Sequence, residues 1–549
     1  MPALDVPPTT PQAVDPAAFK KIIDLGIALS AERNHDRLLE SILLGAKDIS
    51  NADGGTIYLR TDEDRLAFAI IRNDTLGIAM GGTTGKTIPF PPLRMYREED
   101  NQPNHNNVAT HVALTGTTIN IVDAYNAANF DFSGTKAFDQ KTGYRSKSFL
   151  TVPLTNHKGD VIGVLQLINS RLRNTADVIP FDPELVPLIE SLASQAAVAL
   201  DNQQLIAAQK NLFDSFMTMM AAAVDAKSAY TGGHCQRVPV LTEMLAEAAC
   251  NETEGPFKDF HLSEEEWYEL QIAGGLHDVG KVTTPVHIMD KATKLEKITD
   301  RIDEVKVRFE LVKRDVEIEQ LRRLKADGVD KEAVEKELQA QLKQVADDFA
   351  FIAECNVGGE FMADDKIARL KEIAKRQIVL DGKAQQLLSD DEVMNLSIRR
   401  GTLNDADRKI INDHIVLTIQ MLESLPFPKH LRRVPEIAGG HHEKMDGTGY
   451  PKGLTRDQMS VPARMMGIAD IYEALTAADR PYKKPKTVSE SIKIMSFMKK
   501  DHHIDPELFE LFLRSGVYKR YAERFLLPEQ IDEVDINQYL NKPAPAPAR

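Results

Sequence analysis

Five histidines and two aspartates occupy short, distinctive contexts in the later part of the chain. The histidines are His234 in YTGGHCQR, His277 in GLHDVGK, His414 in IINDHI, and the adjacent pair His441 and His442 in GGHHEKMDGTGYP. Asp278 directly follows His277, and Asp470 stands between apolar residues in MMGIADIYEAL. Imidazole nitrogens and carboxylate oxygens are ligands of divalent iron, manganese and zinc. Two such ions can activate a water molecule and hold a phosphate, so the pattern indicates metal-assisted phosphoester chemistry.

Each of these residues taken alone also has a structural interpretation. A single histidine on a helix is usually a packed or exposed residue, and the pair His441-His442 is compatible with a polar surface. An unpaired aspartate at position 470 would be costly to bury. The seven residues together, several of them with apolar helical flanks, are better explained by a metal site than by a core.

The order of these motifs resembles the HD-GYP subgroup of the HD phosphohydrolase superfamily. The HD pair corresponds to His277-Asp278, and GYP corresponds to Gly449-Tyr450-Pro451. Other matching segments are GGHCQRV at 232–238, HDVGKV at 277–282, ADIYEALTAADRPYKK at 469–484 and HIDPELFELFL at 503–513. The resemblance covers about 225–295 and 400–530, and it implies a helical, metal-dependent phosphodiesterase that hydrolyses cyclic di-GMP.

The resemblance also implies the ligand sets of a binuclear centre. One metal ion would be held by His234, His277, Asp278 and Asp470. The second would share Asp278 and add His414, His441 and His442. Some relatives carry a glutamate four residues before the first histidine and hold a third ion, but Tyr230 occupies that position here. We therefore expect two divalent ions, iron or manganese.

Asp278 and Lys281 are the residues expected to act in catalysis. Lys281 follows His277 by four residues, which predicts the same helical face and contact with the phosphate or the leaving group. Substrate-binding residues implied by the resemblance are Gly447, Tyr450, Arg480 and Lys483. Arg480 and Lys483 would hold phosphate oxygens, Tyr450 would stack on or hydrogen-bond the substrate, and Gly447 would allow a turn closed to other residues. The alternative for the three basic residues is a solvated surface.

The elements that position these residues are predicted to be almost entirely helical from 225 to 541. His277 and His414 are unusually far apart for the subgroup, because residues 296–400 form an insertion rich in charged residues and free of proline. Its composition predicts exposed helices with a narrow apolar seam, and Asp327-Gly328 predicts a break between two antiparallel helices. We expect this helical insertion to project from the all-α HD-GYP domain.

Residues 17–183 predict a separate α+β domain. Helical periodicity over about 17–50 is followed by strand-like runs at 54–60 and 66–72 and by a hairpin at 148–169. Residues 17–175 resemble a GAF domain, and the segment 119–169, which carries the resemblance, is particularly similar to the GAF domains of cyclic-nucleotide phosphodiesterases. Their Asn-Lys-Phe-Asp element is reduced here to Asn129-Phe130-Asp131, without the lysine. Binding of a small-molecule ligand and a purely dimerising role both stay open.

Residues 184–224 predict one long helix between the two domains. An apolar row recurs every seven residues at Leu192, Ala199, Ile206, Phe213 and Met220. The companion row contains the polar residues Gln195, Asn202 and Gln209, which would weaken a coiled-coil seam. The alternatives are a helix that packs on its own domain and a coiled-coil helix of a homodimer. Since GAF domains are commonly followed by such a helix, the resemblance favours the homodimer.

Composition limits the partners. The chain has 549 residues, with 67 Lys and Arg against 82 Asp and Glu, a net charge of -15. This balance argues against a nucleic acid polymer and against an anionic membrane surface as partners. Three cysteines, no transmembrane run and no signal peptide predict a cytoplasmic protein. Residues 1–16 and 542–549 are expected to be a disordered leader and tail.

The sequence therefore predicts a GAF-regulated phosphodiesterase that converts cyclic di-GMP to pGpG, GMP or both. One alternative is a degenerate HD-GYP protein that binds a cyclic dinucleotide or a partner protein with little turnover. Such a protein should lack metal ligands, and all seven are present. A second alternative is hydrolysis of another cyclic dinucleotide such as cyclic GMP-AMP, because the motifs specify phosphate chemistry rather than the base.

Overall fold

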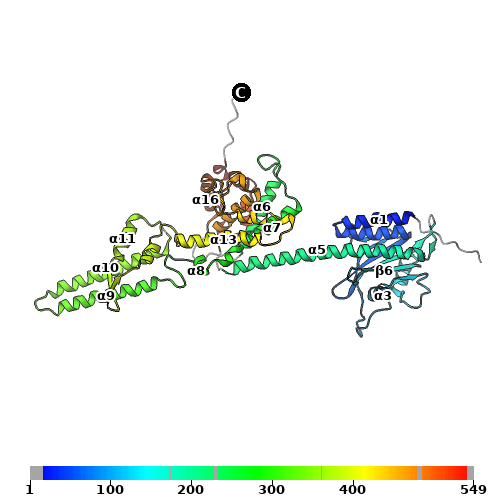
Figure 1. Ribbon diagram of the computed structural model, residues 1–549, viewed down its shortest axis with the longest axis horizontal. Helices are drawn as coiled ribbons and strands as arrows, with labels where there is room; N and C mark the ends of the chain where they lie inside the picture. Colours follow the sequence, from blue (N-terminus) through cyan, green and yellow to red (C-terminus); the bar gives the residue numbers. More distant parts are fainter. Residues whose placement is uncertain (1–15, 173–174, 228–232, 360, 479–484, 541–549) are drawn as a thin grey trace, which may run out of the picture. The chain divides into compact units, whose positions relative to one another are not determined.

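The structure is a computed structural model that describes residues 16–540, except 173–174, 228–232, 360 and 479–484 (Figure 1). The chain divides into two compact units, residues 1–213 and 214–549. The predicted tail and all but the last residue of the predicted leader lie outside the described residues, as does Tyr230. Among the described helices, none is both long and apolar enough to cross a membrane.

The first unit is built on an antiparallel sheet with the strand order β3-β2-β1-β7-β6-β5. Its strands are β1 (Ala52–Arg60), β2 (Arg65–Asn73), β3 (Ile78–Gly81), β4 (Leu93–Arg94), β5 (Ile119–Ile121), β6 (Phe149–Thr155), β7 (Val161–Arg171) and β8 (Val178–Ile179). The β6–β7 pairing confirms the predicted hairpin. The helices are α1 (Pro16–Ala31), α2 (His35–Ser50), α3 (Val108–Thr115), α4 (Ser133–Thr142) and the first part of α5 (Val186–Lys227).

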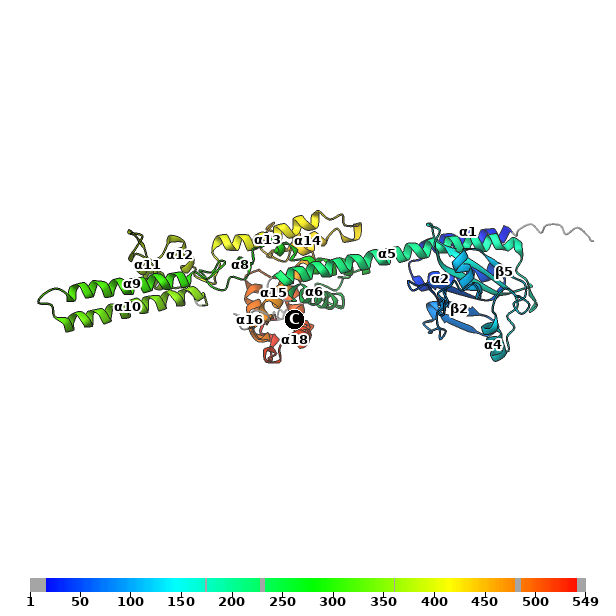
Figure 2. The same ribbon diagram turned by 90° about the horizontal axis from the view of Figure 1, so that it is seen from below.

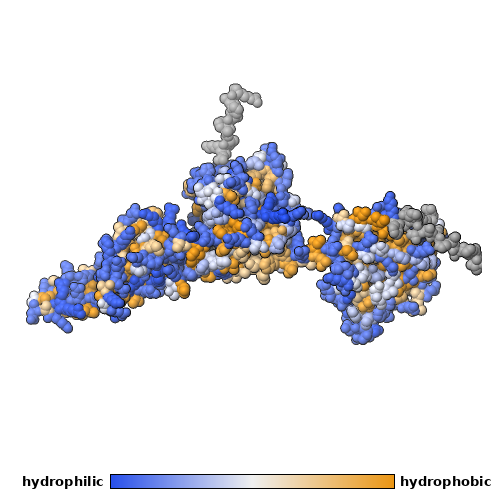
Figure 3. All heavy atoms as spheres, in the orientation of Figure 1, coloured by the Kyte–Doolittle hydropathy of each residue, from blue (hydrophilic) through white to orange (hydrophobic). Residues whose placement is uncertain are grey.

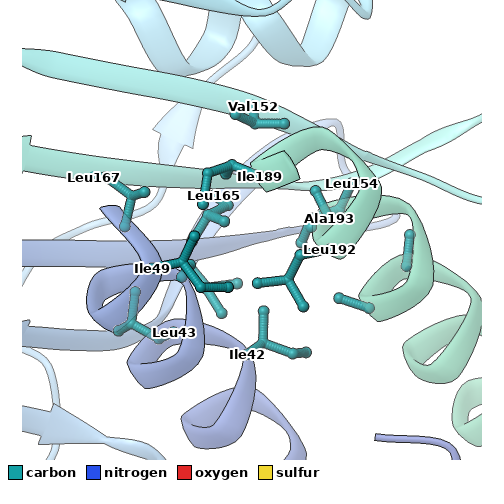
Figure 4. Packing of buried hydrophobic residues seen from close by; sticks show 14 of the residues in the cluster. Ile42, Leu43, Ile49, Val152, Leu154, Leu165, Leu167, Ile189, Leu192 and Ala193 are labelled. Carbon is teal, nitrogen blue, oxygen red and sulfur yellow. The ribbon is translucent and has the colours of Figure 1, made fainter. Parts of the chain in front are cut away.

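Helices cover both faces of this sheet. Successive side chains of a strand point to opposite faces, so one strand contributes to both cores. On β7, Leu165 and Leu167 pack with α1, α2 and α5, whereas Val164 packs with α3. Figure 4 shows the first of these cores, where residues of α2 and α5 meet strand residues. The single helical stretch predicted over 17–50 is in fact two helices. Asn34 separates them, since its side chain accepts a hydrogen bond from the Arg37 amide and caps α2.

The second unit contains many short helices around the predicted metal ligands. They are α6 (His234–Cys250), α7 (Glu264–Leu276), η3 (Val279–Thr283), α8 (Val286–Met289), α13 (Asp405–Glu423), α14 (Val434–Gly439), α15 (Val461–Thr476), α16 (Val488–Lys500), α17 (Pro506–Arg514) and α18 (Val517–Phe525). Helix α6 packs against α7 and α15, and η3 packs against α13. The last contact needs a glycine, because a Cβ on Gly280 would lie 2.0 Å from the His414 carbonyl oxygen.

The predicted insertion packs around its own core. Its elements are α9 (Ile302–Leu324), α10 (Lys331–Val357), α11 (Asp364–Ala374), β9 (Gln377–Leu380), β10 (Lys383–Gln386) and α12 (Asp390–Leu396). The break predicted at Asp327-Gly328 falls between α9 and α10, which pair along their lengths. Buried residues from Leu295 to Leu396 form one apolar cluster, whereas the visible face of the α9–α10 hairpin is largely hydrophilic (Figure 3).

The expectation of a purely helical insertion missed one element, the two-stranded β9–β10 hairpin. Its turn is Asp381-Gly382, and both residues have positive φ, at 53° and 73°. Asp-Gly is among the strongest short signals for this hairpin turn, so the sequence did carry the information.

Candidate metal centre

The structure brings the seven predicted ligands together from five helical segments. His234 begins α6, His277 and Asp278 join α7 to η3, and His414 lies within α13. His441 and His442 follow α14, and Asp470 lies on α15. Figure 2 shows α6, α13, α14 and α15 gathered in this part of the chain. Two groups have donor atoms within 4.8 Å of one another and could each hold an ion: His234, His277 and Asp278, and His414, His441 and His442.

The carboxylate of Asp278 lies between the two groups, and its two oxygens face different histidines. Oδ2 is 3.2 Å from His234 Nε2 and 3.3 Å from His277 Nε2. Oδ1 is 3.2 Å from His414 Nε2 and 3.9 Å from His441 Nε2. A carboxylate placed in this way can give one oxygen to each of two ions.

Asp470 belongs to the first of these groups. Its Oδ1 is 3.2 Å from His234 Nε2 and 3.9 Å from His277 Nε2. It therefore adds a fourth donor beside His234, His277 and Asp278, as the resemblance implies.

The ring orientation of three histidines suits metal binding. Nδ1 of His277 donates to the Gly274 carbonyl at 2.7 Å, and Nδ1 of His441 donates to the Ala438 carbonyl at 2.7 Å. His414 makes the same bond to Ile411. Each bond fixes the proton on Nδ1 and leaves the lone pair on Nε2, the atom that faces the centre.

Several of the inward-facing atoms are buried without a hydrogen-bond partner. They are Asp278 Oδ1, His414 Nε2 and His441 Nε2. Buried polar atoms are nearly always paired in proteins, so an unpaired cluster indicates a missing partner such as a cation. The donor set of neutral imidazole and carboxylate fits a divalent metal, so the residues present fit the implied ions.

Electrostatics favour the ligating forms of His441, His442, Asp278 and Asp470, whereas the carboxylates of Asp278, Asp470 and Glu473 outweigh burial and raise the pKa of His234. Burial lowers the pKa of His441 far below its ordinary value and that of His442 to about 4, so both rings are neutral near pH 7. Burial alone would raise the pKa of Asp278, but Lys281 and His277 outweigh it and hold this pKa well below its usual range. Asp470 is likewise held ionised, because His234 outweighs the effect of burial on its pKa.

Lys281 lies at the centre, but the local backbone structure that places it there differs from the predicted helix. Helix α7 ends at Leu276 and a 3-10 segment follows, so Lys281 does not lie one helical turn above His277. Its ammonium instead forms an ion pair with Asp278 Oδ2, and its side chain is 22% exposed. The predicted phosphate-binding residues Arg480 and Lys483 lie outside the described residues.

The loop after His442 approaches the centre closely. The Tyr450 ring stacks on the His442 ring, with a centroid distance of 4.9 Å and an angle of 20°. Gly447 has φ +80°, as its predicted role requires. Position 449 has no room for a side chain, since a Cβ on Gly449 would lie 2.3 Å from the Lys444 backbone nitrogen. Burial raises the pKa of Tyr450 to about 12, so its hydroxyl stays protonated and able to donate.

Sequence reasoning missed three charged residues that support these groups. Glu473 accepts a hydrogen bond from His234 Nδ1 at 2.5 Å and pairs with Arg237. Glu443 is 3% exposed and accepts the backbone amides of Lys452 and Leu454, which ties the loop down. A signal existed for the first two, because Glu473 follows Asp470 by three residues and Arg237 follows His234 by three.

The first unit contains a cavity of its own, about 400 Å³ in volume. Its lining includes the aromatic residues Tyr58, Phe68 and Phe132, with Asn73 and Gln166 among the polar residues. Asp131, from the segment singled out in the sequence, also lines it. A cavity of this size and character suits a small ligand with an apolar body and a few polar groups.

Two domain models match parts of the chain. Residues 34–200 match the model of the GAF domain, and residues 389–508 match the model of an HD domain. The HD match includes His414, His441, His442 and Asp470, whereas His234, His277 and Asp278 lie before its start.

Curated relatives match parts of the chain. A cyclic di-GMP phosphodiesterase of Pseudomonas aeruginosa is 36% identical over 23% of this chain and 29% of its own length. A 3'3'-cGAMP-specific phosphodiesterase of Vibrio cholerae is 40% identical over 20% of this chain and 23% of its own length. A cyclic di-GMP phosphodiesterase of Thermotoga maritima is 30% identical over 22% and 34%. The chain thus spans about a third or less of the length of these relatives.

Proposed function

We propose that this chain, which contains a GAF domain followed by an HD domain, is a metal-dependent phosphodiesterase that hydrolyses cyclic di-GMP to pGpG, GMP or both. The observation that carries the proposal is the placement of Asp278, whose two carboxylate oxygens face two separate histidine groups. The names of the relatives support the substrate class, since three of them are named as phosphodiesterases of cyclic dinucleotides.

Two divalent ions, iron or manganese, would supply a water nucleophile of lowered pKa and neutralise charge on the phosphate. His234, His277, Asp278 and Asp470 would hold one ion, and Asp278, His414, His441 and His442 the other. Lys281, placed beside Asp278, would donate to a phosphate oxygen and stabilise charge that develops in the transition state. Arg480 and Lys483 would hold phosphate oxygens of the substrate. Tyr450 would form one wall of the substrate pocket beside His442.

Cyclic GMP-AMP is the second candidate substrate, because a relative that is 40% identical carries this specificity in its name. The ligands of the centre act on the phosphate, so they do not distinguish guanine from adenine.

The test is anaerobic purification, metal analysis and chromatography of products from the two cyclic dinucleotides offered separately and in competition. We expect two metal equivalents and hydrolysis of cyclic di-GMP with the higher kcat/KM. Full metal occupancy without turnover of either compound would overturn the proposal and favour a binding protein. A higher kcat/KM for cyclic GMP-AMP would replace the first substrate with the second.

The GAF domain would regulate this activity through a small ligand. The 400 Å³ cavity supports this part of the proposal, because it joins aromatic walls to buried polar groups such as Gln166. Loss of activation by a ligand after Asn73→Leu or Gln166→Leu, with basal turnover unchanged, would support it.

The chain would act as a homodimer joined along α5. Residues 204–212 are exposed on every face of this helix, yet they include Leu205, Ile206 and Leu212. An unpacked stretch with apolar residues is unfavourable in water, and a second copy of the same helix would cover it.

A further inference from the structure

His234 is oriented by different means from His277, His414 and His441. In those three residues, Nδ1 donates a hydrogen bond to the backbone carbonyl three residues earlier in the same turn. His234 is the first residue of α6, so it has no preceding helical turn to supply such a carbonyl. Its Nδ1 donates instead to the carboxylate of Glu473, which comes from α15.

Glu473 is itself fixed in place. Its side chain is only 1% exposed, and its second oxygen accepts from Arg237 Nε at 2.7 Å. Arg237 lies one turn after His234 on α6, so one carboxylate holds two positions of the same helix face. Losing either partner of this buried pair would leave an uncompensated charge, which is strongly unfavourable. The pairing therefore holds the Glu473 carboxylate in one position.

The backbone of His234 is held by a second carboxylate, that of Asp225. Helix α6 has Gly233 as its N-cap, and glycine has no side chain to satisfy the first amides. Asp225 does this from α5: Oδ2 accepts the Gly233 amide at 3.1 Å and Oδ1 accepts the Cys235 amide at 3.3 Å. Asp225 is 7% exposed, and Val224 beside it packs with Cys235.

We propose that Glu473, Arg237 and Asp225 are positioning residues that together fix His234, and that the metal ion of the His234 group depends on them whereas the ion of the His414 group does not. The proposal rests on the proposed two-metal centre. Glu473 fixes the orientation of the His234 ring and keeps its proton on Nδ1, so that Nε2 can bind metal, as carboxylates do for metal-ligating histidines elsewhere. Asp225 sets the start of the helix that carries the ring.

One consequence concerns α5, because Asp225 and Lys227 lie in its last turn. The Lys227 ammonium donates to the carbonyls of Lys281 and Val282. The end of this helix therefore contacts the backbone on both sides of the centre, before His234 and after Asp278. A shift or rotation of α5 would act directly on the backbone amides on either side of His234.

The test is Mn²⁺ titration of the full, metal-depleted chain, with stoichiometry and affinity read by calorimetry. We expect two equivalents for the wild type. Glu473→Ala should weaken one equivalent about 10- to 100-fold and leave the other unchanged. Glu473→Gln should recover part of the loss, since its amide oxygen still accepts the imidazole proton. Asp225→Ala should weaken the same equivalent, and Asp225→Asn should weaken it less.

Glu269→Ala is the matched control. Glu269 is a 3% exposed glutamate that pairs with Arg433 at 2.9 Å, like Glu473 with Arg237, but it touches none of the seven candidate ligands. This variant should bind both equivalents normally. Glu473→Ala added to His234→Ala should cause no further loss, because both act on one interaction.

Three outcomes would overturn the proposal: normal affinity in Glu473→Ala, parallel loss of both equivalents, or the same selective loss in Glu269→Ala. These results are independent of turnover. A wild type that binds two Mn²⁺ but hydrolyses no cyclic dinucleotide refutes the proposed function and leaves the positioning test valid. A wild type that binds no Mn²⁺ refutes both.

Discussion

At the scale of single residues, Asp278 is the position on which both proposed metal sites would depend. Replacing it with asparagine keeps its shape but removes the charge that balances Lys281 and two ions. We expect Asp278→Asn to lose both metal equivalents and to reduce kcat by about 10³-fold or more, since each ion would supply several kcal/mol of stabilisation. Metal analysis and single-turnover kinetics measure the two effects.

Asp413→Asn is a suitable control for this substitution. Asp413 is exposed and stands next to His414, but it is not among the predicted ligands. It should retain both metals and full activity. An active Asp278→Asn enzyme with bound metal would refute the assignment of the centre.

A second residue-scale prediction concerns the ion pair between Arg308 and Glu392, which joins α9 to α12. Their side chains are 18% and 5% exposed. Burial alone would raise the pKa of Glu392, but hydrogen bonds from Arg308 and Ser389 outweigh it and lower this pKa. A lowered pKa in the folded state means that the pair stabilises the insertion at neutral pH. That contribution is lost as the pH falls below about 4.5, the ordinary value for glutamate.

Glu392→Gln should therefore destabilise the insertion by about 1–2 kcal/mol at pH 7 and by less at pH 4. Glutamine can still complete the capping box with Ser389, so the variant isolates the charge. Hydrogen exchange of α12 in both proteins at each pH measures the difference. Glu310→Gln, in an exposed pair with Lys313, should change nothing. A difference that grows towards acid pH would contradict the argument.

At the scale of elements, the insertion should be removable without loss of the centre. Its two ends meet: Thr402 Oγ1 donates to the Lys291 carbonyl at 2.9 Å, and the Lys291 ammonium pairs with Asp407 at 2.7 Å. Leu295 and Leu396 belong to the insertion's own core, so the cut is best placed outside both. Replacing residues 293–400 with a short Gly-Ser linker should leave two metal equivalents and basal activity. Loss of metal would show that the insertion is part of the site.

The elements also show what the sequence could and could not predict. The candidate ligands were found because their residue types carry the chemistry, and the long helix and the β6–β7 hairpin because their periodicity is strong. The placement of Lys281 was wrong, because a 3-10 segment after His277 replaces the expected helix and no periodicity marks it. Glu473 was missed for another reason: its spacing of three residues from Asp470 is a weak signal, and only the fold brings its carboxylate to His234.

At the scale of the whole molecule, α5 is the element on which the proposed homodimer rests. It has 42 residues, about 63 Å of helix. Val198, Leu205, Leu212 and Met219 recur every seven residues and are 39%, 48%, 73% and 58% exposed. This row lies one residue before the apolar row found in the sequence, of which Leu192 is buried and Ile206 is 67% exposed. The exposed seam is therefore wider and more apolar than the heptad rows alone indicated.

We expect the full chain to sediment as a dimer, and the double variant Leu205→Asp/Leu212→Asp to sediment as a monomer, because charges facing each other in an apolar seam repel and lose hydration. Sedimentation equilibrium over a hundredfold range of concentration measures this. Val379→Asp, at a 63% exposed position on β9, is the control and should stay dimeric.

If α5 transmits the state of the GAF domain, the monomeric variant should keep its metals and basal turnover but lose its response to a GAF ligand. A wild-type monomer at all concentrations would leave the apolar row of α5 without its proposed partner and refute the dimer.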